Sequence, residues 1–276
     1  MRIVTALRLF FTNPSTFVAR TKSLVGGWVV HARLKKLAQA GSLPVFVDYK
    51  PGKWPFYDDN DSQEIGYHLN FNEWYSDLLS LFAPYITPGS VVIDVGANLG
   101  FTTLLFARMA GMTGAVHSFE PGNQMAGKLE AMVTANELQN VHVYRMGLGS
   151  QLAELELAIP EYSGNASLSF PSHLSGKKVV IEKVRIERLD DAIGNSLSRL
   201  DFLKIDTEGF EFEVLRGAEQ TISRLKPVIY IELAQDFMQS SQASVNLLKK
   251  LGYRFTVEPD LEKARNGDNF LALPPP

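Results

Sequence analysis

The segment that most constrains the fold is an apolar run that ends in an acidic residue and a glycine-punctuated turn, Val91-Val92-Ile93-Asp94-Val95-Gly96-Ala97-Asn98-Leu99-Gly100. The run predicts a buried β-strand, and Phe101 to Leu105 predicts a helix that begins directly after the turn. Residues without bulky side chains let the backbone approach a ligand closely, and the N-terminus of the helix then faces that ligand. The segment therefore indicates a loop for a nucleotide-type cofactor, with an ordinary strand-to-helix turn as the alternative.

A second strand and an acidic residue follow in the manner of a ribose site. Ala115 to Phe119 predicts the strand, and Glu120 stands at its end, before Pro121-Gly122. A carboxylate there can accept both hydroxyls of a ribose, and nucleoside-binding α/β folds place an acid about 20 residues after the glycine turn. The interval from Gly96 to Glu120 is slightly longer. Glu120 is therefore the candidate ribose ligand, with a solvated strand end as the alternative.

The glycine spacing favours an adenosyl amino acid over a nicotinamide dinucleotide. The pattern Gly-x-Gly-x-x-Gly passes a pyrophosphate over a helix N-terminus, but here Asn98 takes the second glycine position and no third glycine follows. Asp94 precedes the turn, where an ammonium group could bind. S-adenosylmethionine has a ribose and an ammonium but no phosphate, so it fits these residues better than NAD does.

An adenine could sit between apolar and backbone groups at Met146-Gly147, after a third strand predicted from Val141 to Tyr144; a plain connecting turn is the alternative. The candidate cofactor-binding residues are Asp94, Gly96, Asn98, Gly100, Thr102, Glu120, Met146 and Gly147.

A fourth strand, Phe202 to Asp206, carries a lysine and an acid on one face. Lys204 and Asp206 lie two residues apart and so project to the same side, and Glu208 follows in the turn. An ammonium among apolar neighbours needs a charged partner, because desolvating it alone is costly. We therefore expect Lys204 to pair with a carboxylate.

Four motifs stand in one order along the chain: Asp94-Val95-Gly96-Ala97-Asn98-Leu99-Gly100, Phe119-Glu120-Pro121, Asp201-Phe202-Leu203-Lys204-Ile205-Asp206-Thr207-Glu208-Gly209 and Val214-Leu215-Arg216-Gly217-Ala218. Together they resemble the FkbM-like family of S-adenosylmethionine-dependent methyltransferases, over roughly residues 70 to 257. The resemblance implies an α/β fold of the class I methyltransferase type, a Rossmann-like, mostly parallel seven-stranded sheet with helices on both faces. It also implies methylation of a hydroxyl oxygen on a sugar, glycolipid or secondary metabolite.

In that fold the fourth and fifth strands are neighbours, so Asp206 would share a rim with Glu232, which lies near the end of a strand predicted from Val228 to Leu233. Three interpretations stay open. The two carboxylates form an ion network with Lys204, one of them acts as general base toward a substrate hydroxyl, or both help to hold a divalent cation that acidifies the hydroxyl. The candidate catalytic residues are Asp206, Lys204, Glu208 and Glu232, and the candidate metal ligands are Asp206 and Glu232.

Candidate acceptor contacts come from two further segments. Asn72 to Pro84 predicts a helix before the first sheet strand, and in this fold class such a helix commonly covers the cofactor. Trp74 and Tyr75 are therefore candidate substrate residues, although core packing explains Trp74 equally well. Glu154 to Ile159 and Val179 to Arg188 alternate like antiparallel strands, and the polar loop between them is of a length that is often functional. Its candidate substrate residues are Asn165, Ser167 and His173, the last with an exposed loop histidine as its alternative.

Charge divides the chain into a basic N-terminal part and an acidic remainder. Residues 1 to 47 carry seven Lys or Arg and no Asp or Glu, so all 30 acids lie in the rest, and the net charge is −3. Apolar residues recur at helical spacing in two stretches of the basic part. We expect a helical and hairpin extension over residues 1–69 and the methyltransferase domain over 70–276. The basic helices of residues 1–40 contact an anionic membrane surface or an acidic substrate, or they pack on the catalytic domain or on a second subunit of a homo-oligomer.

Composition excludes several classes of protein. The chain has no cysteine, which rules out disulfides, thiolate metal sites and cysteine nucleophiles. Leu24 to Val30, the longest apolar run near the N-terminus, falls far short of the about 18 residues of a membrane span, and Met1 to Thr12 lacks a secretory pattern. We expect a cytoplasmic enzyme, with membrane association as the open alternative, that acts on a small-molecule or glycan hydroxyl. Overall acidity argues against a nucleic-acid partner. The rival classes are a nicotinamide-dependent oxidoreductase and a non-catalytic cofactor-binding module.

Overall fold

The structure, a computed structural model, describes residues 45–49, 52–56, 72–160, 168, 179–265 and 268–276. It divides into two units, residues 1–79 and 80–276. In the first unit β1 (Val45–Tyr49) and β2 (Gly52–Phe56) form an antiparallel pair, which confirms the predicted hairpin. The predicted basic helices lie outside the described residues, and a separate extension over 1–69 stays a prediction.

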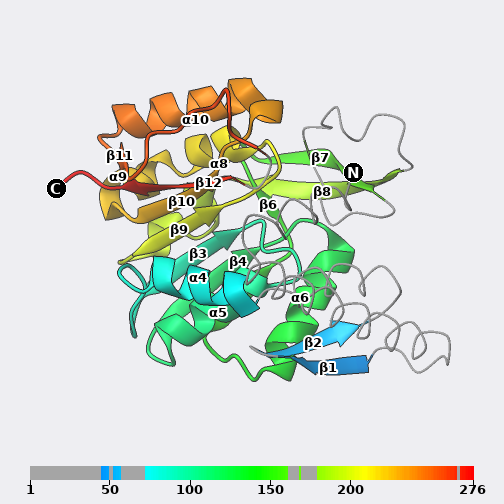
Figure 1. Ribbon diagram of the computed structural model, residues 1–276. Coiled ribbons are helices and arrows are strands. Elements are labelled where there is room, and N and C mark those ends of the chain that lie inside the picture. The colour runs from blue at the N-terminus through cyan, green and yellow to red at the C-terminus, as the bar shows by residue number, and fades with distance from the viewer. Residues whose placement is uncertain (1–44, 50–51, 57–71, 161–167, 169–178, 266–267) are drawn as a thin grey trace, which may run out of the picture. The chain divides into compact units, whose positions relative to one another are not determined.

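The second unit is built on a seven-stranded sheet (Figure 1). Its strands, in the order in which they lie side by side, are β11 (Arg254–Phe255), β12 (Asn269–Leu273), β10 (Val228–Glu232), β9 (Phe202–Ile205), β3 (Val91–Val95), β4 (Ala115–Phe119) and β5 (Val141–Tyr144). The five from β10 to β5 are parallel, and β12 runs antiparallel to both of its neighbours. The mostly parallel seven-stranded sheet is therefore confirmed.

The order of the strands sets the place of a ligand site. From β3 the chain proceeds outward to β4 and β5, and then returns to β9 on the other side of β3. The strand order thus reverses between β3 and β9. Open α/β sheets bind ligands outside the carboxyl ends of the strands at such a switch point.

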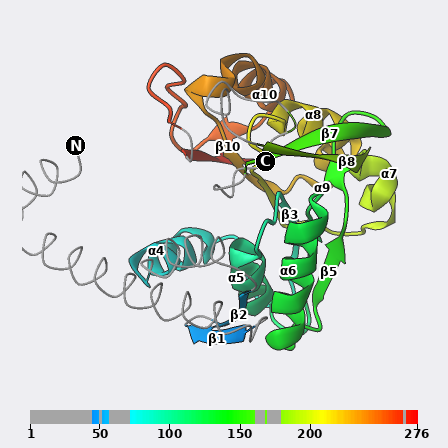
Figure 2. The same cartoon turned by 90° about the vertical axis from the view of Figure 1, so that its right-hand side faces the viewer.

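Helices cover both faces of this sheet (Figures 1 and 2). On one face lie α5 (Phe101–Ala110) and α6 (Asn123–Ala135), and on the other lie α8 (Glu211–Gly217), α9 (Glu219–Leu225) and α10 (Met238–Lys250). The short α7 (Leu189–Ala192) packs against α8 and α9, and η2 (Gly194–Ser196) follows it. The predicted helices on both faces are confirmed.

Three details of the helices differ from expectation. Residues Phe210 to Ile222 carry one apolar face at helical spacing, which predicts a single helix, but the helix is interrupted at Ala218, whose φ of −111° and ψ of 3° end α8 and precede α9. The sequence predicts a short helix from Val245 to Leu251, but α10 begins earlier, at Met238, directly after η3 (Gln235–Phe237). Asparagine is favoured at helix N-caps, so the sequence predicts Asn123 as the N-cap of α6, but Asn123 is the first residue of that helix and its side chain donates to Glu182.

The two faces of the sheet have separate cores. One large buried cluster lies on the side of α8, α9 and α10, and the central strands contribute Ile93, Leu203 and Ile229 to it. On the side of α5, the ring of Phe82, which ends α4 (Asn72–Phe82), lies 5.2 Å from that of Phe202 and 5.3 Å from that of Phe106. The central strands are therefore buried on both faces, and only their carboxyl ends are left for polar chemistry. No helix among the described residues is long and apolar enough to cross a membrane.

A smaller sheet lies beside the carboxyl end of β5. It contains β6 (Gly147–Leu148), β8 (Val179–Glu187) and β7 (Ala153–Pro160), with β8 in the middle. The antiparallel pairing of β7 with β8 confirms the predicted strands, and β6 pairs with β8 in parallel. The strand β8 thereby joins the candidate adenine segment to β7.

Candidate cofactor and catalytic site

Two rows of residues cross the central strands near their carboxyl ends. The strand registers place four of them directly side by side: Ser118 on β4, Asp94 on β3, Lys204 on β9 and Tyr230 on β10. Two positions further along the same segments stand Glu120, Gly96, Asp206 and Glu232. Both rows span the reversal of strand order between β3 and β9.

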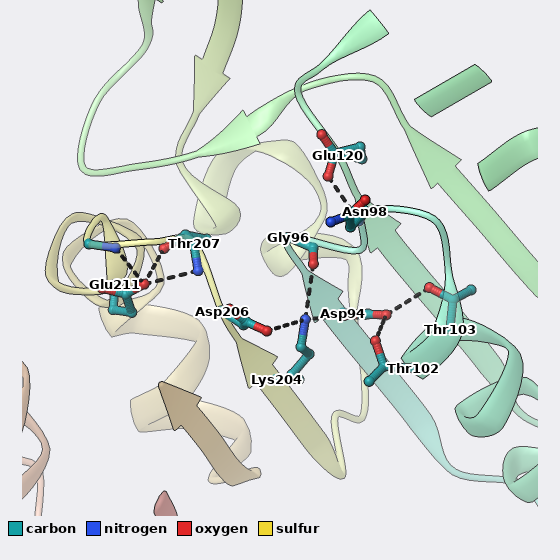
Figure 3. Close-up of polar contacts among 11 residues, drawn as sticks. Asp94, Gly96, Asn98, Thr102, Thr103, Glu120, Lys204, Asp206, Thr207 and Glu211 are labelled. Carbon is teal, nitrogen blue, oxygen red and sulfur yellow. Dashed lines mark hydrogen bonds and ion pairs between the residues drawn. The ribbon is translucent and has the colours of Figure 1, made fainter. Parts of the chain in front are cut away.

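Lys204 connects the two rows (Figure 3). Its Nζ lies 3.3 Å from Asp94 Oδ1 and 3.3 Å from Asp206 Oδ2, and it donates a hydrogen bond of 3.0 Å to the carbonyl oxygen of Gly96. Burial alone would lower the pKa of Lys204, but the charges of Asp206 and Asp94 outweigh it and raise the pKa above its ordinary value. The predicted pairing of the Lys204 ammonium with a carboxylate is therefore present, and the ammonium is charged.

Asp94 lies beneath the glycine turn and is fully buried. Its Oδ2 accepts hydrogen bonds from Thr102 Oγ1 at 2.8 Å and Thr103 Oγ1 at 2.7 Å, while Oδ1 faces Lys204. These contacts fasten the first turn of α5 to β3. Direct contact between Asp94 and an ammonium group, as the sequence suggested, stays a prediction. The observed contacts give Asp94 and Thr102 a supporting position under the loop.

The glycine turn packs against the end of β9. Gly96 has a φ of 73°, and a Cβ there would lie 1.8 Å from the carbonyl oxygen of Asp206. The absence of a side chain at Gly96 is thus explained by close packing between β3 and β9, whereas the sequence attributed it to the approach of a ligand. Gly100 precedes α5 and packs on Met132 of α6. The cofactor loop and the candidate catalytic segment are therefore held in direct contact.

Glu120 holds the other side of the loop. Its Oε2 accepts the N–H of Asn98 and its Oε1 accepts the N–H of Gly122, both at 2.9 Å. Asn98 has a φ of 50°, which is uncommon for a residue other than glycine. Each oxygen of a carboxylate can accept a further hydrogen bond, so Glu120 fits the predicted ribose contact. Burial raises the pKa of Glu120 to about 7, although the two backbone N–H groups oppose that rise.

The candidate adenine segment follows β5. Met146 is half-buried and its N–H donates to the carbonyl oxygen of Tyr144 at 2.9 Å, while the buried Gly147 pairs with Ile186 of β8. The N–H of Glu120 donates to the same Tyr144 oxygen at 3.1 Å. Glu120 and Met146, the candidate contacts of the ribose and the adenine, are therefore both held by the carbonyl oxygen of Tyr144.

Three carboxylates meet where β9 and β10 end. Asp206, Glu208 and Glu232 each offer one oxygen, and these oxygens lie within 4.8 Å of one another. Burial, with the charge of Asp206 as the next cause, raises the pKa of Glu208 to about 7 and raises that of Glu232 well above its usual range. The predicted meeting of Asp206 and Glu232 is thus present, and Glu208 joins them. Such a group can hold a proton or a divalent cation.

Glu211 is a site residue that the sequence analysis missed. It is 2% exposed, and its Oε1 accepts three hydrogen bonds from the turn before it, two from Thr207 and one from Gly209 (Figure 3). An acid in the first turn of a helix, two residues after a glycine turn, was the available signal for such a contact.

The structure does not test the remaining candidates. Trp74 and Tyr75 lie in α4, which confirms the predicted helix, but their side chains lie outside the description. Asn165, Ser167 and His173 fall in residues 161–167 and 169–178, outside the described residues.

This fold and site define a class I methyltransferase: five parallel strands, an antiparallel strand inserted between the fifth and the sixth, a cofactor loop after the first strand and an acid after the second. A family model described as the Methyltransferase FkbM domain matches residues 94–255. The chain belongs to this family and is an S-adenosylmethionine-dependent methyltransferase.

Known relatives match parts of the chain. It is 28% identical over 189 residues to Methyltransferase 1 of Beauveria bassiana, and the match covers 62% of this chain and 75% of that protein. It is 26% identical over 213 residues to the AMB antimetabolite synthetase AmbE of Pseudomonas aeruginosa, covering 63% of this chain but 10% of that protein. The crystal structure of methyltransferase FkbM from Methylobacillus flagellatus is similar with a TM-score of 0.47 and 18% identity, over 78% of this chain and 55% of the other.

Proposed function

We propose that this protein transfers the methyl group of S-adenosylmethionine to a hydroxyl oxygen of a small-molecule or glycan acceptor. The observation that carries the proposal is the group of three carboxylates beside the cofactor loop, Asp206, Glu208 and Glu232. Alcohols ionise poorly at neutral pH, so their methylation needs a base close to the reacting oxygen.

For the cofactor, we assign the ribose to Glu120 and the adenine to Met146 and Gly147. Gly96, Asn98 and Gly100 shape the loop between them, and Asp94 and Thr102 fasten that loop to β3 and α5. When bound, the cofactor supplies an electrophilic sulfonium methyl. The protein has to align the acceptor oxygen opposite the sulfur, at about 3 Å from the methyl carbon, and to remove the hydroxyl proton.

Among the three carboxylates, Glu208 is best suited to remove that proton. A base is most effective when its pKa lies near the working pH, and burial raises the pKa of Glu208 to about 7. Asp206 is already paired with the Lys204 ammonium, whose Nζ lies 3.3 Å from its Oδ2. Glu232 is 4% exposed and so is less accessible to an acceptor than Asp206 and Glu208, which are half-buried. The proton would pass from the acceptor oxygen to the carboxylate of Glu208.

A divalent cation is the second interpretation of the same three residues. Their oxygens are ligands that Mg²⁺ and Ca²⁺ prefer, and a cation there would acidify the acceptor hydroxyl directly. Removal of metal ions distinguishes the two interpretations.

The acceptor class is inferred from the family and from the name of one relative. AmbE is an antimetabolite synthetase, which is consistent with an acceptor from small-molecule biosynthesis. The candidate acceptor contacts stay Trp74, Tyr75, Asn165, Ser167 and His173. Membrane contact through residues 1–40, a homo-oligomer and a cytoplasmic location also stay predictions.

Calorimetry with S-adenosylhomocysteine, followed by an acceptor screen, tests this function. We expect saturable binding that the Glu120→Ala variant loses, and a mass gain of one CH₂ unit on a hydroxylated acceptor. Magnetic resonance of a ¹³C-labelled methyl group then shows whether it is bonded to oxygen. Wild-type protein without affinity for the homocysteine would overturn the cofactor assignment, and a product methylated on nitrogen or carbon would overturn the oxygen assignment.

A further inference from the structure

We infer that Glu211 is a positioning residue of this enzyme: it fixes the backbone of the turn Asp206–Gly209 and so directs Glu208 toward Asp206 and Glu232. The inference rests on the proposed role of these carboxylates. Glu211 itself touches neither the cofactor loop nor the group of three oxygens in any contact described above.

The first argument is the way in which Glu211 is buried. One of its oxygens accepts the N–H of Thr207 at 2.9 Å, the hydroxyl of Thr207 at 2.9 Å and the N–H of Gly209 at 3.0 Å. A buried carboxylate is costly unless it is hydrogen-bonded, and these three donors all come from the turn. The turn and the carboxylate therefore depend on each other.

The second argument is the conformation of the turn. Glu208 has a φ of 54° and Gly209 a φ of 102°, so two successive residues lie in the left-handed region. This region is unfavourable for glutamate and persists where the surrounding structure imposes it. Glu211 binds the residues on both sides of Glu208, which is the arrangement needed to impose that φ.

A third argument comes from the contact between the turn and Phe237, which ends η3. A Cβ on Gly209 would lie 2.4 Å from Cδ1 of Phe237, so the Phe237 ring leaves no space for the turn to shift in that direction. Glu211 and Phe237 thus both confine the turn. Because both belong to elements outside the turn, a change at Glu211 can release the turn without removing any of the three carboxylates.

Glu211 also differs from an ordinary acidic residue of a helix N-terminus. Its neighbour Glu213 lies on the same helix, is 32% exposed and contacts Arg216 at 3.7 Å. Both carry the charge that favours a helix N-terminus, but only Glu211 accepts hydrogen bonds from the turn among the contacts described. Glu213 is therefore a matched control for charge without turn contact.

The test compares Glu211→Ala, Glu211→Gln, Glu211→Asp and the control Glu213→Gln in the full chain with S-adenosylhomocysteine bound. Hydrogen exchange of residues 206–210 is the first measurement. We expect at least about tenfold faster exchange for Glu211→Ala, near-normal exchange for Glu211→Gln, which keeps the accepting oxygen, and no change for Glu213→Gln. Glu211→Asp should resemble Glu211→Ala, because the shorter side chain withdraws the oxygen.

Kinetics with the acceptor found by the mass screen is the second measurement. For Glu211→Ala, kcat should fall about 100-fold, while KM and the Kd of S-adenosylhomocysteine change less than about threefold. Glu211→Gln should recover most of kcat.

Three results would overturn the inference: normal exchange in Glu211→Ala, recovery by Asp but not by Gln, or equal effects at Glu211 and Glu213. Wild-type protein that binds no S-adenosylhomocysteine is a different result. It contradicts the proposed function, and exchange of the turn in the unliganded protein still decides the role of Glu211.

Discussion

The turn after β3 and the turn after β9 lie in contact, yet the carboxylates beside them have different surroundings. Asp94, before the first turn, is surrounded by Lys204 and two threonine hydroxyls. Glu208, in the second turn, lies beside Asp206 and Glu232, and burial raises its pKa to about 7. A carboxylate with enough donors is a fixed part of a binding loop, whereas one crowded by other carboxylates can take up a proton at neutral pH.

Replacing Lys204 should have the largest effect, because Lys204 joins both turns. In Lys204→Met, Asp94 and Asp206 lose their shared cation, and breaking a buried ion pair from one side costs about 3–5 kcal/mol. Chemical denaturation should show a decrease of that size in the free energy of unfolding. The control Lys183→Met removes an exposed lysine 3.2 Å from Glu154 and should change it by less than about 1 kcal/mol. Equal effects at the two lysines would contradict the joining role of Lys204.

Replacing Glu208 should lower turnover but leave cofactor affinity unchanged, which would separate the role of the turn after β9 from that of the turn after β3. Glu208→Gln cannot accept the acceptor proton, so kcat should fall by about 10²–10⁴-fold while the Kd of S-adenosylhomocysteine stays within about twofold. With S-adenosylmethionine kept saturating, wild-type kcat/KM for the acceptor should rise with pH up to about 7, because the base must be deprotonated, and this dependence should vanish in the variant. Full turnover by Glu208→Gln would exclude Glu208 as the base and leave Asp206 or Glu232.

Cofactor affinity should depend on pH through Glu120. Ribose hydroxyls donate to the charged carboxylate, whereas burial raises the pKa of Glu120 to about 7 in the protein without cofactor. Below that pH a proton competes with the ribose, so the Kd of S-adenosylhomocysteine should rise by up to about tenfold per pH unit. Calorimetry between pH 5 and pH 8 measures this. Glu120→Gln should bind more weakly and without the pH trend, and a flat wild-type profile would argue against the ribose contact.

Removal of metal ions should have the smallest effect. If the carboxylates act through a proton, turnover after treatment with EDTA should stay within about twofold of its starting value. A large loss that Mg²⁺ or Mn²⁺ restores would instead establish the cation interpretation for Asp206, Glu208 and Glu232.

The sequence predicted the elements that depend on local patterns. The apolar runs predict the strands and their order along the chain. The family's motifs predict the strand order in the sheet and hence the meeting of Asp206 with Glu232. Long-range contacts were harder to predict. The burial of Asp94 depends on Lys204, which is far away in the sequence, and the carbonyl oxygen of Asp206, directly after β9, leaves no space for a side chain at Gly96.

Local exceptions also escaped prediction. The apolar face from Phe210 to Ile222 continues through Ala218 although the helix does not, because the pattern reports burial and not backbone angles. Glu211 resembled any acid near a helix start, and only the positions of Thr207 and Gly209 reveal what it binds.

The strand β12 has a consequence for how the enzyme matures. It follows β11 in the chain but lies between β11 and β10, where Asn269 pairs with Glu232. During synthesis, the edge of β10 beside Glu232 therefore stays open until residues 269–273 have left the ribosome. A nascent chain can form the loop around Glu120 earlier, but the strand that carries Glu232 gains its partner on this edge only when β12 joins the sheet.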